Sequence, residues 1–463
     1  MTLRISSAVV VALVAGSSSC IPEREAPLEP VKIGVLASTS GALASFGGSL
    51  QKAVRLAQEQ VNAAGGVFDG RPLELVVVDT GSDPATAAAL ASDLVDQGVV
   101  AFVGPETSGQ SDAVLDVAVA AAIPMVSCCA TSTELAGRNQ AGSGFFFRTA
   151  PSDALQGKAL AFIAKNGIDD VASDLSFPAC PQVAFFARAD SYGQGFQSVF
   201  QASYEGQPVG SGAGATVGDV IATGVFPNGD PSQQEIDVAA AAFVGDINTA
   251  ADPTEELCIV FVTFGFEGAR LAGQIEARLA GGPLDGRYHY LTGDGAQEAA
   301  FLQEIGNAPT SLREKLVGTV PFHATAPDGG ATVAFDQFAT AFSARHGEEP
   351  TAYCAQAFDA LFVTALAASK ARSTVGKDVQ NALFSVSGRD GGVRFEDGNF
   401  FGEIAARVLD GDNVDYIGPS GDLTFDAFGD VQGDYVVWQV APAPAEPSFQ
   451  DKVPLPVSAF NPL

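Results

Sequence analysis

The stretch Gly104–Leu135, GPETSGQSDAVLDVAVAAAIPMVSCCATSTEL, begins where one apolar run ends in a polar turn. A second apolar run, IPMVS, ends in another polar turn near the end of the stretch. In an open parallel sheet, ligands bind at the carboxyl ends of the strands, where Ser108 and Thr131 would both lie. Two such hydroxyls, with the free N–H groups of a helix start, can hold a carboxylate. The stretch therefore predicts half of a binding site, although either hydroxyl could instead only cap a helix.

Length and composition fit an α/β protein of two or three domains. The chain has 463 residues, 47% of them hydrophobic, and 51 glycines. Its net charge is −30, from 54 acidic and 24 basic residues. This charge disfavours nonspecific binding to phosphate backbones or anionic lipid, so we expect no nucleic-acid partner.

The first twenty residues have the pattern of a targeting segment. Arg4 precedes the apolar run AVVVALVAG, which is too short to span a bilayer, and small residues lead to Cys20. The pattern resembles a bacterial lipoprotein signal, in which this cysteine becomes the lipidated first residue of the mature protein. Ordinary cleavage near Ser19 is the alternative. We expect export to the periplasm or the cell surface, a lipid anchor at Cys20, and a Pro-rich tether over residues 21–30.

From Val31 the chain alternates apolar strands with helices, which indicates parallel sheets with right-handed crossovers. VKIGVLAS, PLELVVVD, VVAFVG and IPMVS form one series. A second series begins after GFFFRTAPSD, where Ser152 or Asp153 could cap a helix, and continues through CPQVAFFARADSYG, DVIATGVF, CIVFVTFGF, YHYLTGDG and LVGTVPFH. Residues 442–463 form a Pro-rich tail that we expect to be poorly ordered. The pattern predicts two similar doubly wound lobes.

The chain from Val31 to Val440 resembles the type I periplasmic-binding-protein family, in particular the branched-chain amino-acid receptors of ABC importers. The matching segments, in order, are KIGVLASTSGALASFG, VNAAGGVFDGRPLELVVVD, SDPATAAALASDLV, GVVAFVGPETSG, IPMVSCCATSTEL, FFFRTAPSDALQGKAL, ADSYGQGF, TGDG and PTAYCAQAFDAL with SGDLTFDAFGD. The resemblance implies two α/β lobes joined by a hinge of three crossovers, near Thr149, His323 and Val431. Lobe 1 would comprise residues 31–149 and 324–430, and lobe 2 residues 150–323 and 431–441.

The family's ligand residues fall on particular positions of this chain. Ser108, Thr131 and the backbone at Cys129 would bind an α-carboxylate, and Asp294 in TGDG would pair with an α-ammonium. The aromatic walls fall on Phe46, Tyr192, Phe264 and Tyr353. A zwitterion buried between lobes needs both poles satisfied, because an unpaired buried charge is costly.

Two departures from the family bear on the ligand. Phe46 and Phe264 stand where tyrosine is common, and Asp294 is shorter than the usual glutamate. Asp294 could also be a turn residue, and the aromatic residues could belong to the core.

The resemblance implies a substrate-binding protein that delivers an amino acid, branched-chain or similarly apolar, to a membrane permease and its ATPase, and that acts as a monomer. The alternative is a sensing or scavenging protein of the same fold that binds an amide, urea or an aromatic acid. No enzyme, metal or cofactor is expected, because the three histidines form no HExxH motif and the sequence has no CxxC, Walker loop or GxSxG elbow.

Paired cysteines in an exported protein are expected to be oxidised. Cys180 and Cys258 each begin a strand of the second lobe, and a 2-1-3 strand order would make those strands neighbours, which predicts a disulfide between them. Neighbouring cysteines rarely bridge each other. For Cys128, Cys129 and Cys354 this leaves either a bond from one of the first two to Cys354 or three buried thiols.

Overall fold

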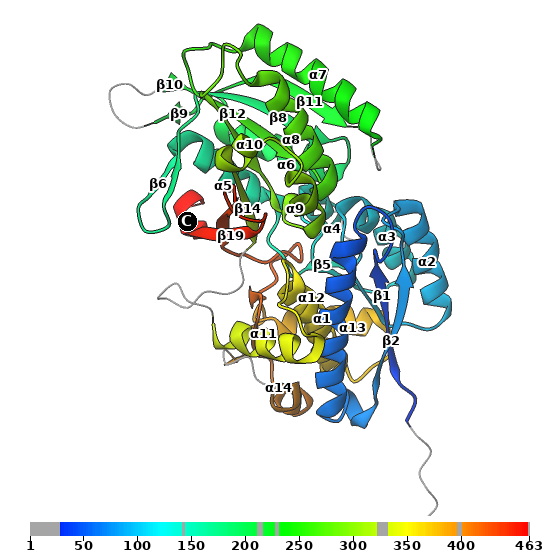
Figure 1. Ribbon diagram of the computed structural model, residues 1–463. Helices are drawn as coiled ribbons and strands as arrows, with labels where there is room; N and C mark the ends of the chain where they lie inside the picture. The colour runs from blue at the N-terminus through cyan, green and yellow to red at the C-terminus, as the bar shows by residue number, and fades with distance from the viewer. Residues whose placement is uncertain are drawn as a thin grey trace, which may run out of the picture.

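The computed structural model describes residues 28–140, 144–210, 216–226, 231–321, 332–395 and 401–461. The targeting segment, Cys20, most of the tether and the crossover near His323 lie outside these ranges. The described chain forms two α/β lobes stacked end to end (Figure 1). In the part of the chain that is described, no helix combines the length and apolarity needed to cross a bilayer.

Lobe 1 is built on a parallel five-stranded sheet of order β2-β1-β3-β4-β5. Its strands are β1 (Val31–Ala37), β2 (Leu73–Asp79), β3 (Ala101–Val103), β4 (Met125–Ser127) and β5 (Phe146–Arg148). The connecting helices are α1 (Ala44–Ala63), α2 (Pro84–Asp96), α3 (Ser108–Ala121) and α4 (Thr133–Gln140). A later part of the chain returns to this lobe as α11 (Val333–His346), α12 (Cys354–Ala371), α13 (Gly376–Val386), β15 (Val393–Phe395), α14 (Phe401–Leu409), β16 (Val414–Gly418) and β17 (Gly421–Asp422). Of these, α12 is buried along nearly its whole length and forms the centre of the lobe.

Lobe 2 has a seven-stranded sheet of order β11-β8-β12-β13-β14-β18-β19. Its strands are β8 (Gln182–Arg188), β11 (Asp219–Phe226), β12 (Leu257–Val262), β13 (Tyr288–Thr292), β14 (Leu316–Pro321), β18 (Tyr435–Val440) and β19 (Phe449–Leu455). Its helices are α5 (Asp153–Asn166), α6 (Ser191–Tyr204), α7 (Gln233–Ala250), α8 (Gly265–Leu279), α9 (Ala299–Ile305), α10 (Thr310–Lys315) and α15 (Val457–Phe460). The pairs β6 (Ile168–Asp170) with β7 (Leu175–Phe177), and β9 (Pro208–Val209) with β10 (Thr216–Val217), lie outside the main sheet. The first five strands of the sheet are parallel, and β11-β8-β12 is the predicted 2-1-3 order.

The tail differs from its prediction. Residues 449–455 form β19, which pairs antiparallel with β18 and closes the edge of the lobe 2 sheet. Phe449 packs on Trp438, with ring centroids 5.0 Å apart, so the tail covers core surface that would otherwise be exposed. Pro454 is tolerated because an edge strand does not need every N–H for the ladder. Proline content alone was therefore a poor guide to order here.

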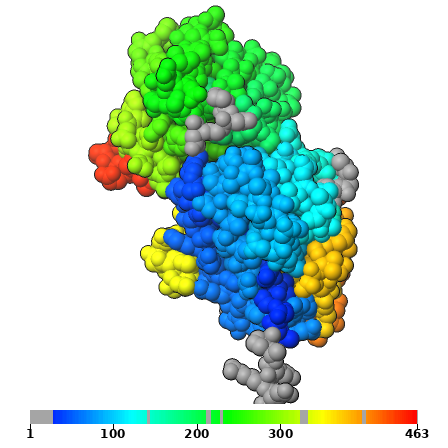
Figure 2. Space-filling model, turned by 90° about the vertical axis from the view of Figure 1, so that its right-hand side faces the viewer, coloured from blue at the N-terminus to red at the C-terminus, as the bar shows by residue number. Residues whose placement is uncertain are grey.

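Two crossovers of the hinge lie side by side. Pro151, just after β5, forms a parallel bridge with Val431, where the chain enters lobe 2 for the last time. Thr149 donates its hydroxyl to the Gln356 carbonyl at 2.7 Å, which fixes the first crossover to α12. In Figure 2 the blue, cyan and orange segments pack into one mass and the green segments into the other, as expected of lobes that share a repeatedly crossing chain.

The cysteines follow the prediction in one pair and contradict it in the other. Cys180 and Cys258 form a disulfide, with Cα atoms 5.5 Å apart, at the starts of neighbouring strands. Cys128 and Cys129 are also bonded to each other, which corrects the expectation that adjacent cysteines stay apart. The chain bends directly after β4, so both sulfur atoms can meet across the bend. Cys354 is a buried free thiol that faces Thr351 and the Ser49 carbonyl on α1.

Candidate ligand-binding cleft

A small cavity of about 30 Å³ lies between the lobes. It is lined from lobe 1 by Leu43, Phe46, Glu106, Thr107, Cys129 and Tyr353, and from lobe 2 by Phe264, Asp294, Gly295, Gln297 and Glu298. An outer cavity of about 450 Å³ shares Phe46, Gln297, Glu298 and Tyr353 with it. One water needs roughly 30 Å³, whereas small-molecule sites measure roughly 300–1,000 Å³. The lobes are thus closed on each other around the inner cavity, and a ligand must part them to enter it.

Asp294 joins the two lobes at the centre of the cleft. It follows β13 in a short turn, Asp294–Ala296, and is only 7% exposed. Its carboxylate accepts hydrogen bonds from the hydroxyl of Tyr192 on α6, at 3.0 Å, and from the hydroxyl of Tyr353 in lobe 1. Burial raises the pKa of Asp294, although both tyrosines favour its charged form. One carboxylate therefore connects a lobe 2 strand end to the start of α12.

Tyr353 reaches Asp294 from a strained backbone position. Its φ is 66°, in the left-handed region that residues other than glycine seldom adopt. The residue precedes α12 directly, and its ring meets that of Phe46 edge to face at 5.8 Å. Strain of this kind persists only where surrounding contacts enforce it, and it is found disproportionately at functional sites.

The polar end of lobe 1 differs in detail from what the sequence indicates. Thr107, not Ser108, caps α3, since its hydroxyl accepts from the Gln110 N–H at 3.1 Å. The Ser108 hydroxyl instead accepts from the Ser132 N–H at 3.1 Å and ties the ends of β3 and β4 together. Cys129 lines the cavity, whereas Ser108 and Thr131 are buried beside it. Their role in binding a carboxylate stays a prediction.

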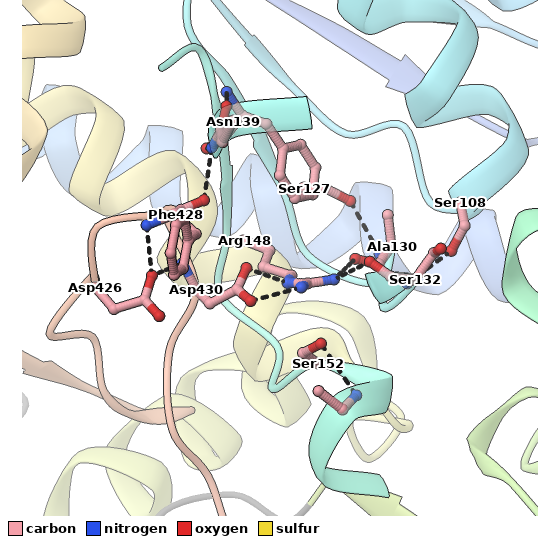
Figure 3. A network of polar contacts seen from close by, with 12 residues as sticks. Ser108, Ser127, Ala130, Ser132, Asn139, Arg148, Ser152, Asp426, Phe428 and Asp430 are labelled. Atoms are coloured by element: carbon pink, nitrogen blue, oxygen red, sulfur yellow. Dashed lines mark hydrogen bonds and ion pairs between the residues drawn. The ribbon is translucent and has the colours of Figure 1, made fainter. Parts of the chain in front are cut away.

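Arg148 holds the loop that carries these groups (Figure 3). Its guanidinium forms a two-pronged ion pair with Asp430, with both N–O distances 2.7 Å. It also donates to the carbonyls of Ala130 and Ser132 at 3.1 and 2.9 Å. Because Arg148 is fully buried, these bonds fix the backbone of residues 130–132 relative to β5.

The lobe 2 wall is a layered aromatic stack. The rings of Tyr192 and Phe264 are parallel within 3° and lie 5.7 Å apart. The Arg188 guanidinium lies 4.4 Å from the centre of the Phe264 ring and pairs with Asp190 and Glu267 at 2.7 and 2.6 Å. The arginine therefore stiffens the wall while its charge is already matched by two carboxylates.

Three buried acids in the cleft were not anticipated. Glu106 follows β3 and accepts from the Ser38 N–H and hydroxyl at 3.0–3.2 Å. Asp153 opens α5, is fully buried, and neither of its carboxyl oxygens has a hydrogen-bond partner within the usual limits; the Thr131 hydroxyl and the charge of Arg148 both lower its pKa. Glu298 accepts from the Gly265 N–H through one oxygen, and its other oxygen is buried without a partner.

Burial raises the pKa of all three acids above its ordinary value. Burial raises the pKa of Glu106 and of Glu298 to about 7. The pKa of Asp153 lies well above its ordinary value, because the group is buried and Asp294 is a neighbouring carboxylate. The sequence signal for these residues is an acid directly after a strand or at a helix start on the cleft edge. From the sequence alone, Asp153 is only a possible helix cap.

Comparisons with known proteins agree with the fold. Residues 30–222 match the family model described as periplasmic binding protein. The Leu/Ile/Val-binding protein homolog 3 of Brucella melitensis is 29% identical over 204 residues, which is 44% of this chain and 50% of the relative, so the chain spans about half of that protein's length. The chemotactic signal transduction system substrate-binding protein BasB of Halobacterium salinarum is 26% identical over 424 residues, covering 90% of this chain and 89% of the relative.

A solved structure shows the same architecture. The substrate-binding protein LivJ of a branched-chain amino acid transporter from Streptococcus pneumoniae, in complex with isoleucine, superposes with a TM-score of 0.64. The identity is 23%, and the match covers 91% of this chain and all of that one. At this identity the likeness establishes the fold, two α/β lobes joined by three crossovers.

Proposed function

Since the chain belongs to the type I periplasmic binding proteins, we propose that it captures an α-amino acid between its lobes and delivers it to an ABC importer. The main support is the Asp294 carboxylate, buried between hydroxyls from both lobes and available to pair with an ammonium. The helix start at Ser108 and the loop around Cys129 belong to lobe 1, and in this proposal they would supply the N–H groups and hydroxyls for the carboxylate.

Delivery requires the protein to be outside the cytoplasm. We propose that residues 1–20 direct export and that a lipid anchor at Cys20 holds the monomer close to a permease and its ATPase. The lobes would open, take the ligand on one lobe, and close over it, with the closed state favoured by contacts that span both lobes.

A thermal-shift screen of the full-length protein tests this function. The ligands are the twenty amino acids, small amides, urea and aromatic acids, because a ligand that binds the folded state raises the unfolding midpoint in proportion to RT ln(1 + [L]/Kd). We expect an amino acid to give the largest shift. If only ligands without an amino group respond, the amino-acid assignment is wrong.

Replacement of Asp294 tests the ammonium pole directly. Asp294→Ala should weaken amino-acid binding by about 2 kcal/mol or more, because a buried ligand charge loses its partner. Titration calorimetry measures the change. Unchanged affinity would place the ammonium elsewhere in the cleft.

A chemosensory role is the second candidate. It is favoured by the relative BasB, a chemotactic substrate-binding protein that aligns along 90% of this chain. Uptake of radiolabelled ligand by cells with and without the gene separates the two roles. Loss of uptake supports transport, and loss of taxis with normal uptake supports sensing.

A further inference from the structure

The cleft contains more buried carboxyl groups than one zwitterionic ligand can pair with. Four buried acids lie in or against it: Glu106, Asp153, Asp294 and Glu298, each 7% exposed or less. Among the described residues, neither the inner cavity nor the outer one is lined by lysine, arginine or histidine. A neutral amino acid contributes one positive and one negative pole, so it leaves the excess of carboxyls unchanged.

The nearby arginines are already paired with other carboxylates, although the charge of Arg148 also lowers the pKa of Asp153. Arg148 forms a two-pronged ion pair with Asp430, and Arg188 is shared between Asp190 and Glu267. Each arginine thus has at least one carboxylate of its own in addition to the four acids of the cleft. Protons on these acids, or a cation from outside the described chain, would balance them.

Glu106 and Glu298 lie on opposite walls of the same cavity. Glu106 comes from lobe 1 and Glu298 from lobe 2, and the cavity between them is bounded by the rings of Phe46, Phe264 and Tyr353. Aromatic faces with buried carboxylates form a good environment for an alkylammonium or guanidinium group. Glu298 is also shared with the outer cavity, which gives a ligand chain room to extend past Asp294.

Only one of the two carboxylate oxygens of Glu298 accepts a hydrogen bond. The Gly265 N–H holds the first oxygen, and glycine is needed there because a Cβ at 265 would lie 2.3 Å from Glu298 Cγ. The second oxygen is buried without a hydrogen-bond partner, which an apolar ligand side chain cannot correct. A cationic group in the cavity would satisfy it.

We propose that the ligand is an amino acid with a cationic side chain, such as lysine, ornithine or arginine. Its side-chain cation lies between Glu106 and Glu298, and its α-ammonium binds Asp294. The assignment rests on the proposed function for the α-amino and α-carboxylate poles. It changes the expected ligand class from the apolar amino acids of the resemblance to basic ones.

The test compares lysine with neutral analogues of similar chain length. Titration calorimetry on the full-length protein measures lysine, ornithine, arginine, norleucine, 6-hydroxynorleucine and leucine. We expect at least one basic amino acid to bind about tenfold or more tightly than norleucine and 6-hydroxynorleucine, as expected when a buried carboxylate gains its partner. Norleucine, leucine or 6-hydroxynorleucine binding as tightly as every basic amino acid would overturn the inference and leave the proposed function intact.

Two variants locate the second cation. Glu298→Gln and Glu106→Gln should each reduce the preference for the basic amino acid over norleucine, with little loss of norleucine affinity. Glu74→Gln, at an exposed position on β2, makes the same charge change away from the cleft and should leave the preference unchanged. A preference unchanged in both cleft variants overturns the inference.

Cadaverine, which is lysine without its carboxyl group, separates the inference from the function on which it rests. It should bind much more weakly than lysine. If it binds equally well, the carboxylate pole is absent, and both the amino-acid function and the basic-amino-acid assignment fail. If neutral amino acids bind best, only the cationic assignment fails.

Discussion

Tyr353→Phe tests whether the bond between Tyr353 and Asp294 closes the lobes. The substitution removes one hydroxyl and keeps the ring that packs on Phe46. The bond joins lobe 1 to lobe 2, so it is made only when the lobes are closed. A hydrogen bond to a charged group contributes about 1.5–3 kcal/mol. The closed state should lose that much relative to the open one, which lowers ligand affinity up to about 10- to 150-fold.

Tyr192→Phe provides a matched control. Tyr192 donates to the same carboxylate at 3.0 Å, but both residues belong to lobe 2, so the bond is available in the open and closed forms alike. Calorimetry gives the affinity of each variant, and small-angle X-ray scattering of the ligand-free proteins gives the proportion of open molecules. We expect Tyr353→Phe to be more open and weaker in binding than Tyr192→Phe. Equal affinities and equal scattering in the two variants would refute a closing role for Tyr353.

Two further predictions concern stability. Because burial raises the pKa of Glu106 and Glu298 to about 7, the folded chain retains protons between roughly pH 4.5 and 7 that the unfolded chain has lost, so the free energy of unfolding falls as pH rises through this window. Glu298→Gln should remove the part of this pH dependence that Glu298 causes. It should raise the free energy of unfolding at pH 8 by up to about 3 kcal/mol, with little change at pH 4.5. Replacing Cys180 and Cys258 together by alanine opens a cross-link with a sequence separation of 78 and should lower the free energy of unfolding by about 2–5 kcal/mol.

Urea denaturation of the ligand-free protein measures both effects. Glu74→Gln is the control for the first, since an exposed glutamate should not change the pH dependence. A Glu298→Gln profile parallel to that of the wild type would mean that the buried glutamate carries no unbalanced charge. For the second, unreduced wild type is compared with the double variant, and equal midpoints would show that the cross-link contributes nothing to stability.

The sequence predicted the fold because its signals are local and repeated. Apolar runs separated by single helices indicate parallel sheets, and the lobe 1 sheet and the first five strands of the lobe 2 sheet are parallel. The 2-1-3 order of the lobe 2 strands, and with it the Cys180–Cys258 pair, also followed from this pattern. The β19 edge strand was missed because its pairing with β18 outweighs its proline content, a tertiary effect that local composition does not contain.

The ligand-binding role of the expected site residues stays a prediction, and the structure shows only where they lie. Five of the expected ligand residues line the inner cavity, namely Phe46, Cys129, Phe264, Asp294 and Tyr353. Ser108 and Thr131 lie beside the cavity, and their hydroxyls face the Ser132 N–H and Asp153. The three additional acids were missed because an isolated Glu or Asp in a turn is ordinary in a sequence. Only the closed lobes show that they converge.

The convergence of the four buried acids makes closure of the lobes depend on the ligand. Glu106 belongs to lobe 1, whereas Asp153, Asp294 and Glu298 belong to lobe 2, so closing brings acids together out of water. Like charges and desolvation oppose this step in the ligand-free protein, whereas the Tyr353–Asp294 bond favours it. A bound cation removes the repulsion and leaves the bond, and it therefore binds the closed form better than the open one, which is the condition for a ligand to shift the equilibrium. The same acids that lower the stability of the empty protein thus give a cationic ligand a higher affinity for the closed form than for the open one.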